Sequence, residues 1–246
     1  MSQGRVRPAP RWSAFWLQVG MAVWLGCAVL ACAAAGCGGG LKYTVDDAVL
    51  DTVPAGERAN VRQAQEQLDG AQAEARAAEN DLGGLAQDTA AAAGEKEAAR
   101  LEIEKAIADQ EGARASRDEN QTNTATHNRD VADLGLKATQ AKLAWLDKKR
   151  DWLKQNRSAA EAHVEEAKAR LELEKARVAR QKGLTPGKDL HLSDYESQWQ
   201  RKNADWESEK RDAAGQEQQT RSKEKQWREL EARYRKTHGN TQGTMR

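Results

Sequence analysis

The sequence has few of the residues that build a compact hydrophobic core. Phenylalanine occurs once, at Phe15, and isoleucine twice, at Ile103 and Ile107. Alanine dominates the remaining apolar residues. Large aliphatic and aromatic side chains are needed to offset the chain entropy that a globular domain loses on folding. We therefore do not expect a compact globular domain. Abundant charge combined with alanine predicts long helices or a coiled coil instead.

Cysteine is also scarce, and the charges nearly cancel. The three cysteines are Cys27, Cys32 and Cys37, so no cysteine follows position 37 and the body of the protein cannot form a structural disulfide. Residues 1–36 contain three arginines and no acid, which leaves 36 basic and 38 acidic side chains in the rest of the chain. Nucleic-acid-binding domains are strongly basic, so we expect no nucleic-acid partner.

Motifs for enzymatic chemistry are missing too. The sequence has no glycine-rich phosphate loop, nucleophile elbow or Cys-x-x-Cys pair. His127, His163, His191 and His238 are far apart in the sequence. His163 and Glu166 share a helical face but in the reverse order of the Glu-x-x-His di-iron pattern, so we expect a solvated face there. We predict no catalytic residue, cofactor or metal, and the protein is not expected to be an enzyme.

The first 40 residues have the organisation of a bacterial export signal. Three arginines, the last at Arg11, precede an uncharged run that extends from Trp12 to Leu41. Within that run, Ala34-Ala35-Gly36-Cys37 is followed directly by three glycines. A basic region, an apolar region and small residues before the cleavage point are typical of a signal peptide. The arginines are expected to stay inside the cell while the rest of the chain is exported.

The end of this run resembles the lipobox of bacterial lipoproteins, and the resemblance covers only the first 40 or so residues. It implies that Cys37 is lipidated with fatty-acyl chains such as palmitate and that cleavage follows Gly36. Cys32, after Val29-Leu30-Ala31, is the alternative acceptor. Family members kept at the inner membrane have Asp after the cysteine. The glycine at position 38 therefore implies the outer membrane, at its periplasmic face.

An uncleaved membrane anchor is the alternative to a lipoprotein. Phe15 to Ala35 is a run of about 20 residues interrupted by Gln18 alone, long enough to span a bilayer. The protein would then be a signal-anchored inner-membrane protein with the same periplasmic helices.

The rest of the chain is predicted to be all-α. We expect an elongated coiled coil or antiparallel helical hairpin of two or three long helices, with a disordered N-terminal tether and a disordered C-terminal tail. The predicted segments are a signal peptide (1–36), a flexible tether (37–53), an Ala-rich heptad helix (54–119), a loop or weak helix (120–128), a second long helix (129–182), a turn (183–192), a third helix (193–238) and a tail (239–246).

Heptad repeats support the first predicted helix. One core position is apolar at eight successive heptads, and a second position is apolar over four. An alanine-lined core buries little apolar surface, so this helix needs a partner. Whether it folds back onto the second helix or continues into it is left open by the sequence. The first position comprises Ala64, Ala71, Ala78, Leu85, Ala92, Ala99, Ala106 and Ala113, and the second Val61, Leu68, Ala75 and Leu82.

Tryptophans predict how the second and third helices pack. The short turn between them makes an antiparallel hairpin. In this hairpin Trp199 should meet Ala176 and Trp206 should meet Ala169. The ring of Trp227 should lie between Trp145 and Trp152. Tryptophans at heptad spacing are more often part of a helix-packing core than a platform for stacking ligands. The predicted helix-packing residues are Trp145, Trp152, Trp199, Trp206 and Trp227.

These patterns favour a non-enzymatic, membrane-anchored envelope lipoprotein that acts as a coiled-coil spacer or docking scaffold in the periplasm. The expected partners are the membrane, through the lipid, and another protein, through the coiled coil. The pattern also allows a homo-oligomer and proximity to peptidoglycan. The alternative function is a helical-hairpin adaptor component of a transport or secretion assembly, although such adaptors also carry β-rich domains.

Overall fold

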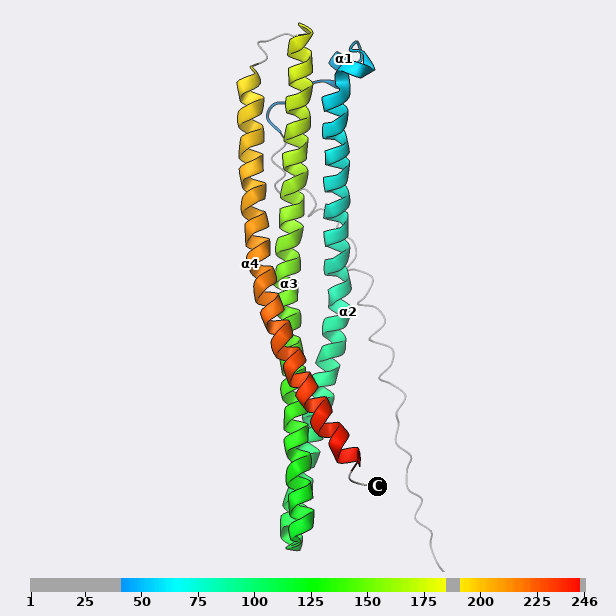
Figure 1. Ribbon diagram of the computed structural model, residues 1–246, viewed down its shortest axis with the longest axis vertical. Coiled ribbons are helices and arrows are strands. Elements are labelled where there is room, and N and C mark those ends of the chain that lie inside the picture. The colour runs from blue at the N-terminus through cyan, green and yellow to red at the C-terminus, as the bar shows by residue number, and fades with distance from the viewer. Residues whose placement is uncertain (1–40, 185–190, 244–246) are drawn as a thin grey trace, which may run out of the picture. The chain divides into compact units, whose positions relative to one another are not determined.

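The computed structural model describes residues 41–184 and 191–243, and it confirms the predicted all-α class for them. Its elements are α1 (Asp47–Leu50), the short 3-10 helix η2 (Ala55–Arg58), α2 (Ala59–Ser116), α3 (Glu119–Gln181) and α4 (Leu192–Gly243). No strand occurs among these residues. Figure 1 shows α2, α3 and α4 lying side by side, with α3 between the other two.

The interface between α2 and α3 confirms the predicted heptad core. Seven of the eight residues at the first core position are buried, from Ala64 to Ala106, and Ala113 at the end is half-buried. Ala64, Leu68 and Ala71 pack against Ala167 and Leu171 of α3. Because residues early in α2 contact residues late in α3, the two helices are antiparallel. The first helix therefore folds back and does not continue as one rod.

The turn between α2 and α3 is shorter and earlier than predicted. Arg117 adopts a left-handed conformation (φ 58°) and ends α2. The Asp118 carboxylate then accepts hydrogen bonds from the backbone N–H groups of Asn120 and Gln121, at 2.9 and 3.2 Å, and caps α3. Residues 120–128, predicted to be a loop or a weak helix, are helical, so the loop is excluded, and the second helix begins at 119 rather than 129.

Threonine hydroxyls in this polar stretch find their hydrogen-bond partners within the helix. The Thr122 hydroxyl donates to the Asp118 carbonyl at 2.8 Å, Thr124 to the Asn120 carbonyl at 2.9 Å, and Thr126 to the Thr122 carbonyl at 2.8 Å. Each side chain bonds to the carbonyl of the preceding helical turn and does not compete with the helix. These residues, which disfavour helices in isolation, are thereby accommodated in the first turns of α3.

α3 buries two faces because it has a long helix on each side. Leu146 and Leu153 pack against Leu85 and Ala92 of α2. On the other side, Gly135 lies against the ring of Tyr234 in α4. Its apolar residues therefore follow two stripes, one for each neighbouring helix.

The end of α4 also differs from the prediction. The third helix was expected to stop at residue 238, before a tail over 239–246, but α4 continues to Gly243. A single glycine costs a helix about 1 kcal/mol and does not stop it when no proline follows. Residues 244–246 lie outside the described part of the chain, as do 185–190 of the predicted turn. That turn begins at Gly183, whose φ of +66° ends the preceding helix.

Candidate functional site

Residues 41–53, which we call the docked segment, are packed against the long helices. Val45 and Leu50 are 5% exposed, and Val53 is 3% exposed. Leu50 and Val53 contact Val178 of α3. The predicted flexible tether over 37–53 is therefore wrong from residue 41 onward, because its apolar side chains are buried. Residues 37–40 lie outside the described residues.

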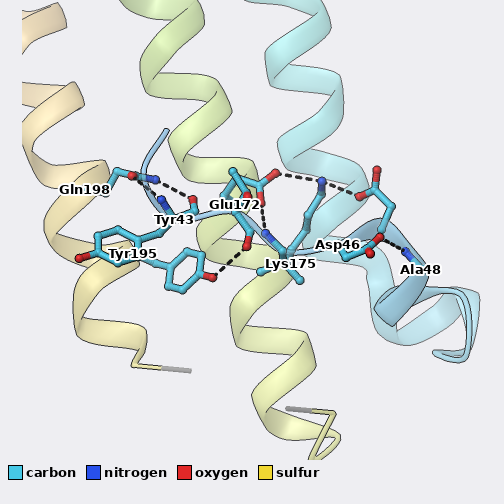
Figure 2. A network of polar contacts seen from close by, with 10 residues as sticks. Tyr43, Asp46, Ala48, Glu172, Lys175, Tyr195 and Gln198 are labelled. Atoms are coloured by element: carbon cyan, nitrogen blue, oxygen red, sulfur yellow. Dashed lines mark hydrogen bonds and ion pairs between the residues drawn. The ribbon is translucent and has the colours of Figure 1, made fainter. Parts of the chain in front are cut away.

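The beginning of the docked segment is held by α4. The side-chain amide of Gln198 binds the backbone of Tyr43 twice: its oxygen accepts from the Tyr43 N–H, and its nitrogen donates to the Tyr43 carbonyl, both at 3.0 Å. The Tyr195 hydroxyl donates to the Thr44 carbonyl at 3.2 Å. The rings of Tyr43 and Tyr195 are 5.8 Å apart. An extended segment without a neighbouring strand thus has its backbone groups satisfied by helix side chains (Figure 2).

The next part of the docked segment is held by α3. The carboxylate of Glu172, which is 8% exposed, accepts a 2.6 Å hydrogen bond from the backbone N–H of Val45. Its other oxygen binds the ammonium of Lys175 at 3.0 Å. That ammonium also contacts the Asp47 carboxylate at 2.6 Å. Glu172 and Lys175 thus connect two residues of the docked segment, Val45 and Asp47, to α3 through one charged network (Figure 2).

Two groups of this network have shifted pKa values. Burial lowers the pKa of Lys175, but its hydrogen bonds to Asp47 and Glu172 more than offset this, so the pKa is raised above its ordinary value. Burial, with the nearby charges of Glu172 and Asp194, raises the pKa of Tyr195. Both shifts favour the protonated side chain in the folded protein. The network is therefore intact at neutral pH, with a charged lysine and a neutral tyrosine.

The far end of the docked segment is attached to the start of α2. Val61 of α2 and Leu184 pack against the cluster of Leu50, Val53 and Val178. An ion pair joins Glu57 of η2 to Lys182, just after α3. The docked segment consequently contacts all three long helices at one end, and it ties that end together.

The predicted helix-packing tryptophans lie along α3 and α4. Trp145 stacks on Trp227, with ring centroids 4.7 Å apart and planes at 11°. Trp152 packs against the cluster that contains Leu85 and Leu153. This arrangement joins α4 to α3 and α3 to α2 at the same level of the bundle.

The remaining two tryptophans have polar partners that the sequence did not indicate. Trp199 packs against the cluster containing Ala176, as predicted, and its indole N–H also donates to the Glu166 carboxylate at 2.6 Å. Trp206 does not face Ala169. It stacks on His163, with ring centroids 4.3 Å apart. The predicted pairing of Trp206 is therefore wrong, since its ring lies nearly two turns earlier in α3, at His163.

His163 and Glu166 do not lie on a solvated face, contrary to the expectation. Glu166 is 5% exposed beneath Trp199. The Nδ1 atom of His163 is 2.9 Å from the Glu74 carboxylate, so this histidine bridges α2 and α4. Both residues face a neighbouring helix because α3 is covered on two sides. Their roles in the structure are contacts between helices.

The sequence-predicted lipidation sites, Cys37 and the alternative Cys32, lie outside the described residues. The residues that sequence reasoning missed are those of the charged network and the side chains that hold Tyr43. One weak signal was available: Tyr43, Val45, Leu50 and Val53 place several large apolar side chains in a chain that has few.

Searches for other kinds of site gave negative results in the described ranges. None of their helices has an apolar stretch long enough to cross a bilayer. No cluster of histidine, cysteine, aspartate or glutamate suited to a metal ion occurs in residues 41–184 and 191–243. No protein-family model, curated protein or solved structure matches the chain.

Proposed function

We propose that the protein is a non-enzymatic envelope lipoprotein whose lipid on Cys37 holds one end of a helical spacer at the membrane. The observation that carries this proposal is the docked segment. Only residues 38–42 separate Cys37 from Tyr43, which is bound to α4. Six residue steps reach roughly 20 Å at most. A lipid on Cys37 would therefore keep the tied end of the helices close to the membrane surface.

The lengths of the helices support a spacer role. α3 contains 63 residues, and at 1.5 Å per residue it is roughly 95 Å long. The turn at Arg117 lies at the opposite end of α3 from the docked segment. A protein anchored in this way could hold that turn, or a partner bound to it, at a fixed distance from the membrane. The resemblance of residues 34–37 to a lipobox, with glycine at position 38, favours the outer membrane.

Globomycin treatment with metabolic palmitate labelling tests this proposal. We expect labelled wild-type protein and accumulation of the longer precursor when the lipoprotein signal peptidase is inhibited. Cys37→Ser should abolish both the label and the sensitivity, whereas Cys32→Ser should leave them intact. Labelling that is lost in Cys32→Ser and kept in Cys37→Ser would assign the lipid to Cys32. Unlabelled protein that keeps its N-terminus at the membrane would instead support the signal-anchored alternative.

A second candidate is a helical-hairpin adaptor of a transport or secretion assembly. One observation favours it: the hairpin of α2 and α3 continues past the end of α4, so its turn is left uncovered by α4 (Figure 1). Arg117 and Glu119 in this turn are exposed. A photo-crosslinking residue at position 117 should then capture a specific envelope protein in living cells. The same residue in place of exposed Arg76, in the middle of α2, should not.

A further inference from the structure

A groove of about 380 Å³ lies where α1, α2 and α3 meet, directly beside the docked segment. Leu50, Val61 and Leu171 are among the residues that line it. Arg58, at the end of η2, and Arg62, in the first turn of α2, line it as well. The groove thus combines apolar side chains with two guanidinium groups, a combination that suits a ligand with an anionic and an apolar part.

The two arginines are free to bind an anion. Arg58 ends η2 and Arg62 lies in the first turn of α2, and both side chains line the groove. Neither guanidinium has a hydrogen-bond or ion-pair partner among residues 41–184 and 191–243. Guanidinium groups bind phosphate through paired, charge-assisted hydrogen bonds.

The other charged side chains in the groove are less suited to bind an anion than the two arginines. Lys175 lines the groove, but its ammonium is already bound by Asp47 and Glu172, at 2.6 and 3.0 Å. Asp51 also lines the groove and has no such partner among the described residues. Among the cations that line the groove, the two arginines are therefore the ones without a carboxylate partner. The positive charge available to an anion there is that of the two guanidinium groups.

We propose that this groove binds the headgroup phosphate of an anionic phospholipid, with the glycerol and first methylene groups over Leu50, Val61 and Leu171. The inference rests on the proposed function, because a lipid on Cys37 would bring the groove to the membrane surface. The apolar side chains in the lining favour a phospholipid over free phosphate. Binding there would supplement the covalent lipid by fixing how the tied end of the helices meets the membrane.

Titration with a soluble short-chain phospholipid tests the site. The full chain, expressed and processed in a bacterial host, is purified in maltoside micelles and titrated with dihexanoyl phosphatidylglycerol. Native mass spectrometry counts the bound molecules. We expect one bound lipid, and an affinity at least tenfold lower in the double variant R58A/R62A. The matched control, R76A/R114A, removes the same charge from exposed positions of α2 outside the groove and should bind like wild type.

Further probes distinguish the sources of phosphate. Inorganic phosphate should compete at least tenfold more weakly than dihexanoyl phosphatidylglycerol, and Val61→Asp should weaken binding of the lipid. Equal competition by inorganic phosphate would overturn the phospholipid assignment, and equal loss in R76A/R114A would show nonspecific charge attraction. Circular dichroism checks that each variant is folded. If the protein binds the lipid at this site but carries no acyl chains, the proposed function is contradicted and this inference stands. If the protein is acylated but binds no added lipid, this inference is contradicted and the proposed function stands.

Discussion

Replacing Glu172 with alanine should release the docked segment from α3. The substitution removes the 2.6 Å hydrogen bond to the Val45 N–H and the 3.0 Å contact with Lys175. Hydrogen bonds to a charged group contribute about 1.5–3 kcal/mol, and a buried donor left without a partner costs about 1–3 kcal/mol. These two free energies partly describe the same lost hydrogen bond and are not added, so we expect docking to weaken by about 2–3 kcal/mol. The open population should rise about 30- to 150-fold.

Amide hydrogen exchange followed by mass spectrometry measures this release. Peptides covering residues 43–53 should exchange faster in Glu172→Ala by the factor given above, while peptides from the middle of α2 and α3 should change little. Glu172→Gln keeps the acceptor and the shape of the side chain, so it should show a smaller increase. Unchanged exchange at 43–53 would refute the role assigned to Glu172. A uniform increase along the whole chain would show that it acts on global stability instead.

Alkaline pH should loosen the same contacts. The pKa of Lys175 is raised in the folded protein, so its contribution is fully present below its ordinary pKa of 10.5 and is lost as the pH rises through the folded value. The raised pKa of Tyr195 acts in the same direction, from its ordinary value of 10.0 upward. Exchange at 43–53, corrected for the intrinsic rate, should therefore be constant from pH 7 to 9. An increase within that range would contradict the assignment.

Other substitutions test the packing of the long helices by urea unfolding. Gly94→Ala should stabilise the protein by about 0.5–1 kcal/mol, because an added Cβ would meet nothing within 4 Å; a loss would indicate a contact not described above. Gly135→Ala should destabilise it by about 1–3 kcal/mol, since that Cβ would lie 2.9 Å from the Tyr234 ring. Arg117→Gly should add about 1 kcal/mol, because φ is 58° there; no gain would argue against the left-handed turn. Trp227→Ala should remove about 2 kcal/mol with its stacking on α3, and unchanged stability would show that α4 is held elsewhere.

Long, regular repeats were the predictable part of this fold. The heptad positions from Ala64 to Ala106 required no knowledge of a partner, since an apolar residue every seven positions marks the buried side of a helix. The hairpin of α3 and α4 was likewise predictable from the glycine and proline between them. Exact pairing was not. Trp206 was assigned to Ala169 in the same register as Trp199 and Ala176, but its ring stacks on His163 instead, so one register does not describe both pairs.

The docked segment could not be predicted because its partners are distant and its own sequence is short. Tyr43 binds Gln198 across 155 positions, and Val45 binds Glu172 across 127. A stretch of this length has no periodicity to analyse, and the preceding glycines suggested a flexible chain. The polar residues after Asp118 were predicted as a loop or weak helix because the sequence does not show which local hydrogen bonds they form. Their propensities disfavour a helix interior, but a carboxylate caps the first backbone N–H groups there and the threonine hydroxyls bond to carbonyls of the preceding turn.

The mass of the N-terminal peptide of the mature protein, purified from bacterial membranes, tests the anchor most directly. Tandem mass spectrometry should find a first residue at Cys37 carrying a diacylglyceryl group on sulfur, with nothing from residues 1–36 remaining. Recovery of a chain that still begins at Met1 with an unmodified Cys37 would contradict the proposal. The docked segment would then tie the helices together without linking them to a lipid.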